Sequence, residues 1–231
     1  MTSPRCILLA GASGLVGGRV LARLLADPRG PRVLAPVRRP LQAGTARLSA
    51  LVANLADASM DRELLEKISA SGSPPEAFVC CLGTTLRKAG SHEAFLAVDR
   101  DLVLRLSDIA HQAGARHAIL VSSVGASAQS GNFYLRVKGE TERGLSDMGY
   151  SRVDLLRPGL LLGDRSESRL GEAFARALAP LSNPLLRGSL RRFRAVDADT
   201  VAAAAVTLLG ETGDGRFVHE YAELLALAAR A

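Results

Sequence analysis

A glycine-rich loop separates the first apolar run of the chain from the first amphipathic segment, and this arrangement constrains the fold more than any other feature. The loop follows the spacing G-x-x-G-x-x-G from Gly11 to Gly17. Short apolar runs and segments of helical periodicity then alternate along the chain. Strands that alternate with helices of about ten or more residues form βαβ units around a parallel sheet. The sequence therefore predicts an α/β fold, with a doubly wound parallel sheet in a single domain over residues 1–231.

The spacing of apolar residues places the individual elements. Strands are expected at Arg5–Ala10, Arg32–Val37, Leu48–Asn54, Ala77–Leu82, His117–Val121 and Arg152–Leu156. Helices are expected at Leu15–Ala26, Asp61–Ala70, His92–Ala113 and Phe133–Asp147. Beyond Arg157 the pattern is less regular, which predicts a small substrate-side lobe within residues 165–231 and two final helices.

The position of the glycine loop, between a strand and a helix, is typical of a dinucleotide site. Glycines there permit a tight turn and let the backbone approach a pyrophosphate, which lies on the N-terminus of the helix. The carboxyl end of the fourth expected strand should border the same crevice. The residues expected to bind the dinucleotide are Gly11, Ala12, Ser13, Gly14, Leu15, Val16, Gly17, Leu82, Gly83 and Thr84.

Arg38 and Arg39 follow the second expected strand, where an NAD-preferring site carries an acidic residue for the ribose 2′-hydroxyl. The closest acidic residue upstream is Asp27, which precedes that strand. Guanidinium groups can bind a 2′-phosphate with two hydrogen bonds each. The pair predicts NADP(H) as the cofactor, and the alternative is a solvated pair of surface arginines.

Tyr134 and Lys138 form the strongest candidate for chemistry, because the only other lysines in the chain are Lys67 and Lys88. Residues four apart share one face of a helix. An ammonium beside a phenol favours the phenolate, so the tyrosine can give and take a proton. Ser122 and Ser123 precede this helix at the end of a strand, where a hydroxyl can hold a substrate oxygen. The alternatives are a tyrosine stacked on a surface lysine and serines that only form a turn.

The composition and the net charge limit the classes of molecule that the protein is expected to bind. The net charge is +6, but the only basic cluster is Arg187–Arg194, and aromatic residues make up 4% of the chain. This favours a solvated rim or a site for an anionic or amphipathic small molecule over nucleic acid. The cysteines are Cys6, Cys80 and Cys81, an odd number without zinc spacing. They predict reduced thiols, no metal and a cytoplasmic location. The apolar runs are all too short for a membrane span.

Several motifs together resemble those of atypical short-chain dehydrogenases of the Tat-interactive-protein oxidoreductase type, which are relatives of the NmrA-like group. The spacing of the glycine loop already resembles that of extended and atypical short-chain dehydrogenases. The resemblance covers most of Arg5–Glu172. Its motifs are Cys80-Cys81-Leu-Gly-Thr-Thr85, Lys88-Ala-Gly90, Val98-Asp-Arg-Asp101, Ser122-Ser123-x-Gly-Ala126, Tyr134-Leu-x-Val-Lys-Gly-Glu140, Arg157-Pro-Gly-x-Leu-Leu162, Asp164-Arg-x-Glu-Ser-Arg169 and Gly171-Glu172.

This resemblance implies a Rossmann-like domain that binds NADPH, with Tyr134 as proton acceptor and Lys138 as cofactor partner. It also implies that Leu161 lies by the nicotinamide and that Arg169 lies near the cofactor or substrate. Asp99 departs from the pattern, since extended dehydrogenases often carry asparagine at that helix position. The expected function is an NADPH-dependent oxidoreductase acting on a carbonyl or alcohol. The alternatives are a non-catalytic NADP(H)-sensing protein and a sugar-nucleotide epimerase, for which the tail is short.

Overall fold

A seven-stranded sheet forms the centre of the molecule, with the strand order β3-β2-β1-β4-β5-β6-β9. The computed structural model describes residues 4–41, 44–57, 59–163, 186 and 188–231. All neighbouring strands of this sheet run parallel, which confirms the predicted doubly wound architecture. The strands are β1 (Cys6–Ala10), β2 (Arg32–Val37), β3 (Leu48–Val52), β4 (Ala77–Cys80), β5 (His117–Val121), β6 (Arg152–Leu156) and β9 (Gly215–His219).

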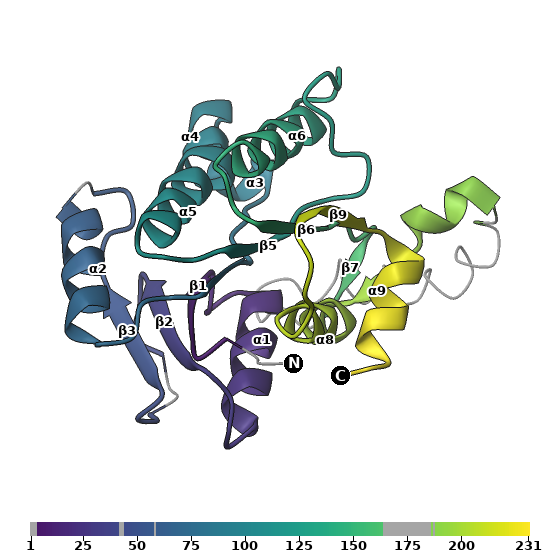
Figure 1. Cartoon of the computed structure of the whole chain (residues 1–231). Coiled ribbons are helices and arrows are strands. Elements are labelled where there is room, and N and C mark those ends of the chain that lie inside the picture. Colours follow the sequence, from purple (N-terminus) through teal and green to yellow (C-terminus); the bar gives the residue numbers. More distant parts are fainter. Residues whose placement is uncertain (1–3, 42–43, 58, 164–185, 187) are drawn as a thin grey trace.

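Helices cover both faces of the sheet (Figure 1). One face carries α1 (Leu15–Ala26), α8 (Ala198–Leu208) and α9 (Tyr221–Ala228), and the other carries α2 (Ser59–Ala70), α5 (Val103–Gln112) and α6 (Phe133–Ser146). The shorter elements are α3 (Leu86–Ala89), α4 (His92–Leu96), the π-helix η1 (Ala97–Leu102), the 3₁₀-helix η2 (Gly188–Phe193), and the strands β7 (Leu161–Leu162) and β8 (Val196–Asp197), which pair with each other. None of the described helices is both long and apolar enough to cross a membrane.

The strands alternate their side chains between two hydrophobic clusters, one on each face. Ile7 and Leu9 pack under α1 and α8, whereas Leu8 and Ala10 pack under α2 and α5. Such two-sided burial explains why the strands read as continuous apolar runs. Cys80 is buried in the second cluster, and burial raises the pKa of its thiol to about 12, so it stays protonated.

Two parts of the chain differ from the sequence prediction. The expected single helix His92–Ala113 is wrong, because α4, η1 and α5 follow one another and the middle turn is π-helical. The strand β9 was not predicted at all. It pairs with β6 and extends the main sheet, so part of the expected lobe region 165–231 belongs to the central layer.

A buried carboxylate ties the three last strands of the sheet together. Asp154 on β6 has no exposed surface, and its oxygens lie 2.7 Å from Nε2 of His117 and 2.6 Å from Nε2 of His219. Arg152 also donates two hydrogen bonds to this carboxylate, at 2.6 and 3.0 Å. Burial alone would raise the pKa of Asp154, but these hydrogen bonds outweigh it and hold the pKa well below its usual range.

Candidate active site

The glycine loop and the end of β4 meet where the strand order reverses, at the carboxyl edge of the sheet between β1 and β4. Gly11 has φ +82°, and a Cβ atom there would lie 2.7 Å from the carbonyl carbon of Cys81. A Cβ atom at Gly17 would lie 2.1 Å from the carbonyl oxygen of Gly11. Both positions therefore require glycine, and the loop is folded tightly against the strand ends. Open parallel sheets bind ligands at this kind of reversal.

The N-terminus of α1 lies at the same edge of the sheet, directly after the glycine loop. Gly14 caps this helix without a side chain, and the first turn contains no acidic residue. Its free N–H groups and the positive end of the helix dipole therefore suit a phosphate. Among the predicted loop residues, Ala12 and Val16 are buried in the core, so only their backbone atoms can contact a ligand. Ser13 is exposed.

Arg38 and Arg39 lie directly after β2, and both are exposed. Among the described residues, neither guanidinium has a hydrogen-bonding or ionic partner. Because β2 is the neighbour of β1, its carboxyl end lies on the same edge of the sheet as the glycine loop. Among the described residues, two cations without a partner are thus available at the β2 side of this edge.

Helix α6 carries Tyr134 and Lys138 on one face, as the sequence predicted. The side chain of Asn132 caps the helix by accepting a hydrogen bond from the backbone of Leu135 at 3.1 Å, which places Tyr134 in the first turn. The ring of Tyr134 packs against the buried ring of Phe95, with centroids 5.7 Å apart. The ammonium of Lys138 lies 6.0 Å from the centre of the tyrosine ring.

Lys138 is an ion-pair partner of Asp99, a residue whose role the sequence left open. The Nζ atom of Lys138 lies 2.7 Å from Oδ1 of Asp99, and the exposed fractions of the two side chains are 7% and 0%. Gly83 borders the pair, since a Cβ atom at this glycine would lie 3.6 Å from Nζ of Lys138. The pair is thus next to the segment that follows β4, beside the glycine loop.

Burial disfavours the charged form of Lys138, but the carboxylate of Asp99 and the phenol of Tyr134 outweigh this effect. The pKa of Lys138 is therefore raised above its ordinary value. The ammonium that would assist Tyr134 is permanently charged at neutral pH and already balanced by a carboxylate.

The predicted serines lie at the end of β5. Ser122 is 6% exposed, and its Oγ has no hydrogen-bond partner among the described residues. Ser123 is half-buried, and its hydroxyl makes only a 3.5 Å contact with the carbonyl oxygen of Val124. A buried hydroxyl without a partner is costly unless a ligand satisfies it. Ser122 is therefore well suited to receive a ligand atom.

Gly139 is a positioning residue that the sequence did not lead us to predict. A Cβ atom at this position would lie 2.1 Å from the carbonyl carbon of Ser127, so glycine allows α6 to approach the loop that follows Ser122 and Ser123. Glycine inside a helix is unfavourable by about 1 kcal/mol relative to alanine. A glycine directly after Lys138 in a helical segment is the sequence signal that could have indicated such a close approach.

The two remaining predicted residues lie on the C-terminal side. Leu161 is half-buried in β7, which pairs with β8, and it packs against the core cluster that contains α1. A Cβ atom at the nearby Gly163 would lie 2.9 Å from a methyl group of Leu15. These contacts bring the segment after β6 to the start of α1. Arg169 lies outside the described residues.

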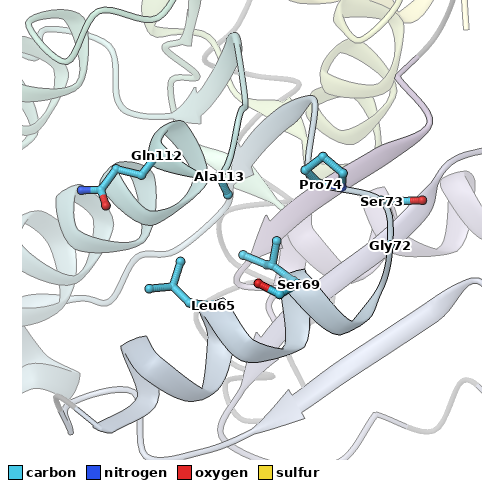
Figure 2. A pocket seen from close by; sticks show the side chains of 8 residues that line it. Leu65, Ser69, Gly72, Ser73, Pro74, Gln112 and Ala113 are labelled. Atoms are coloured by element: carbon cyan, nitrogen blue, oxygen red, sulfur yellow. The ribbon is translucent and has the colours of Figure 1, made fainter.

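A separate cavity of about 530 Å³ lies at the opposite, amino edge of the sheet, between the C-terminal ends of α2 and α5 (Figure 2). Its lining is uncharged and consists of Leu65, Ile68, Ser69, Gly72, Ser73, Pro74, Gln112 and Ala113. It contains none of the residues singled out above. In the described part of the chain, no three His, Cys, Asp or Glu side chains are grouped as metal ligands would be.

The sequence pattern of NAD(P)H-binding proteins matches residues 11–161, which run from the glycine loop to Leu161. The chain belongs to the NAD(P)H-binding family. Within this family, it is 36% identical over 200 residues to protein fmp52, mitochondrial, of Emericella nidulans, covering 87% of this chain and 85% of the relative. It is 37% identical over 172 residues to protein HTATIP2 of Rattus norvegicus, covering 74% of this chain and 69% of the relative. The predicted relationship to atypical short-chain dehydrogenases is thereby confirmed.

Two solved structures illustrate the fold that this chain shares with known proteins. A short-chain dehydrogenase of Leptospira borgpetersenii with bound NAD+ superposes with a TM-score of 0.69 at 14% identity, covering 96% of this chain and 93% of that one. The UDP-glucose 4-epimerase of Thermotoga maritima, with UDP-glucose, gives a TM-score of 0.67 at 17% identity, covering 97% and 82%. At these identities the likeness concerns the fold, and it confirms the Rossmann-like architecture.

The predicted cytoplasmic location is contradicted by the relatives, since several fungal members are named as mitochondrial proteins. The prediction rested on the cysteines, and Cys6, Cys80 and Cys81 are indeed free thiols. Two of them are fully buried in the core, where they act as small hydrophobic side chains. Thiols in such positions report on packing and cannot distinguish one compartment from another.

Proposed function

We propose that this member of the NAD(P)H-binding family is an NADPH-dependent oxidoreductase that transfers a hydride to or from a carbonyl or alcohol carbon of a small molecule. The observation that carries the proposal is the Tyr134/Lys138 pair, with its ammonium buried and charge-balanced, beside the glycine loop at the reversal of the sheet. A protein that only holds a dinucleotide has no use for a proton-transferring tyrosine at this place.

Each residue then has a defined task. A bound nicotinamide supplies the hydride acceptor or donor. During reduction, Tyr134 gives its hydroxyl proton to the oxygen of the substrate while the carbonyl carbon gains the hydride, and the reverse reaction returns both. Ser122 or Ser123 donates a hydrogen bond to the same oxygen. Lys138 assists Tyr134 electrostatically and binds the nicotinamide ribose.

The remaining predicted residues would hold the cofactor. The backbone from Gly11 to Gly17 binds the pyrophosphate on the N-terminus of α1, and Leu82–Thr84 borders the adenosine ribose. Leu161 would contact the nicotinamide, and Arg169, which lies outside the described residues, keeps the role near the cofactor or substrate that the resemblance implies. The two exposed guanidiniums after β2, which have no ionic partner among the described residues, support a preference for NADPH over NADH.

An anionic or amphipathic substrate is supported by the segment η2. Arg191 and Arg192 are exposed there, next to Leu190 and Phe193, whose exposed fractions are 51% and 38%. The backbone of Phe193 packs against Gly159, in the loop that follows β6. Basic and apolar side chains thus lie together next to the loop that follows β6, where they could contact an anionic or amphipathic substrate.

The NADP(H)-sensing alternative is the second candidate function, and the same purified protein tests both. Molecules that co-purify with the chain are identified by mass spectrometry, and NADPH oxidation is then followed with a panel of carbonyl compounds. Turnover of at least one carbonyl compound is expected. Tight NADPH binding without turnover of any member of a broad panel, together with a partner that distinguishes NADP+ from NADPH, would replace the enzyme with the sensor.

A further inference from the structure

Asp99 and Lys138 come from different elements and meet inside the protein. Asp99 lies in the π-helix η1, and Lys138 lies in the second turn of α6. Their 2.7 Å contact is almost completely shielded from water. Among the described residues, this ammonium is the one ionic partner of Oδ1 of Asp99. A carboxylate buried in this way is stable only with its cation, and the cation only with its carboxylate.

The surroundings hold Asp99 in place from three sides. Its Oδ2 accepts a hydrogen bond at 2.8 Å from the backbone N–H of Thr84, directly after Gly83. Its backbone carbonyl accepts a hydrogen bond at 2.9 Å from the hydroxyl of Thr141, one turn beyond Lys138. The π-helical turn supplies the third constraint, because it interrupts the regular helix at this residue. The carboxylate thereby links the segment after β4 with α6.

Two other titratable groups act on Lys138. The phenol of Tyr134 lies on the same helix, and the thiol of Cys80 approaches from β4. Burial raises the pKa of Cys80 to about 12, so this thiol is neutral under ordinary conditions. At neutral pH, Asp99 is therefore the group that supplies the negative charge for the ammonium.

We propose that Asp99 is a positioning residue of the site: it keeps Lys138 as an ammonium, and its charge balances that ammonium so that Tyr134 meets the substrate as a phenol. This inference rests on the proposed function, since it concerns the same Tyr134/Lys138 pair. An unbalanced ammonium favours a phenolate, which can only accept a proton. A phenol is the state that carbonyl reduction requires, so Asp99 sets the site for reduction.

The scarcity of lysine makes the charge of Lys138 directly measurable. Selective carbon-13 labelling of lysine side chains gives signals from Lys67, Lys88 and Lys138 alone, and their titration is followed by NMR in the protein without cofactor. In the wild type, Lys138 is expected to lose its proton above the ordinary pKa of a lysine, which is about 10.4. In Asp99→Asn, burial acts without the counter-charge, so Lys138 is expected to titrate at least about one pH unit lower than in the wild type.

Glu142→Gln is the matched control, because Glu142 is also buried on α6, one turn after Lys138, and pairs with Arg157. This variant should leave the three lysine curves unchanged. Identical curves for Lys138 in Asp99→Asn and in the wild type would overturn the proposal. Should Asp99→Asn not fold, the wild type decides alone: a pKa of Lys138 below the ordinary lysine value of about 10.4 overturns the proposal, and a pKa above it supports the proposal.

The state of Tyr134 has its own readout. The chain contains no tryptophan and three tyrosines, so near-ultraviolet absorbance reports tyrosine ionisation without interference. The difference spectrum between the wild type and Tyr134→Phe should contain no phenolate band at neutral pH, and such a band would overturn the second half of the proposal. Neither measurement uses cofactor or substrate. Failure of either therefore differs from an absence of turnover with the carbonyl panel, which bears on the proposed function.

Discussion

The two ends of the candidate site are built in opposite ways. At the α6 end, the charged groups are buried and paired before any ligand arrives, as the contact of Lys138 with Asp99 shows. At the β2 end, Arg38 and Arg39 are exposed and unpaired among the described residues. Preorganised buried charges suit chemistry, because they need no rearrangement during the reaction. Exposed charges suit recognition, because they lose little when the ligand is absent.

The largest effect is expected at the buried end. Tyr134→Phe removes the proton-transferring hydroxyl and keeps the ring that packs on Phe95. Turnover with a carbonyl substrate should fall by about 10²–10⁴-fold, while the Kd for NADPH, measured by fluorescence titration, should change little. Tyr150→Phe is the control, since Tyr150 is not among the residues of the candidate site and its hydroxyl donates a hydrogen bond to the carbonyl of Ser107. It should lower stability and leave turnover per folded molecule intact. Equal turnover in wild type and Tyr134→Phe contradicts the assigned role.

Asp154 tests whether a buried carboxylate outside the candidate site affects turnover. It is as buried as Asp99, but it lies within β6. Asp154→Asn leaves Arg152 and the histidines without their carboxylate and should lower the free energy of unfolding by about 3 kcal/mol, measured with urea. Turnover per folded molecule should not change. A selective loss of turnover without loss of stability would show that burial of charge is functional at β6 as well.

The pH dependence follows from the lowered pKa of Asp154. Its contribution to stability is present above the unfolded pKa of about 4 and is lost as the pH falls from there toward the lower folded pKa. Asp154→Asn should therefore lose less stability than the wild type on acidification through this range. If the free energies of unfolding of the two proteins fall in parallel across this range, Asp154 is not the source of the acid sensitivity.

Two adjacent glycines of α1, Gly17 and Gly18, allow an effect on cofactor binding to be distinguished from an effect on the stability of the helix. Gly17→Ala places its methyl group against the Gly11 carbonyl, so the loop must shift, at a cost of about 1–3 kcal/mol and with weaker NADPH binding. A Cβ atom at Gly18 would lie 3.6 Å from the Ala12 carbonyl oxygen, an ordinary contact. Gly18→Ala should therefore stabilise the helix by about 0.5–1 kcal/mol and keep NADPH binding. Thermal unfolding and fluorescence titration distinguish the two, and equal NADPH affinity in both variants argues against the loop as the pyrophosphate site.

The smallest effect is expected for cofactor choice. Arg38→Ala combined with Arg39→Ala should weaken NADPH binding about tenfold, or about 1.4 kcal/mol, and leave NADH binding nearly unchanged. Arg62→Ala, at another exposed arginine on α2, should change neither Kd. Equal losses for NADPH and NADH would remove the assignment of these arginines to the 2′-phosphate.

The sequence predicted most of the sheet because its strands are buried on both faces and read as unbroken apolar runs. The strand β9 breaks that rule: it lies at the edge of the sheet, and its residues Gly215, Arg216 and Phe217 show no apolar run. The π-helical turn was also missed, because its apolar spacing still fits a regular helix. It differs only in the register of its backbone hydrogen bonds, which no sequence pattern records.

The residues of the candidate site also fall into those that the sequence predicted and those that it did not. Local spacing was sufficient for the glycine loop and for Tyr134 with Lys138, since both depend on residues a few positions apart. The partner of Lys138 was not readable, because Asp99 is 39 residues away and reaches the lysine only through the packing of η1 on α6. The unpaired hydroxyl of Ser122 likewise became visible only once its surroundings were known.

The buried ion pair also restricts how this protein can evolve. Changing Asp99 or Lys138 alone leaves a buried charge without its partner, which costs about 3–5 kcal/mol, a large part of the 5–15 kcal/mol that stabilises a typical domain. A lineage that abandons the chemistry must therefore replace both residues in close succession or first gain stability elsewhere. Among homologues the two positions should vary together, so that a loss of catalysis would be recorded as a change at two sites far apart in the chain.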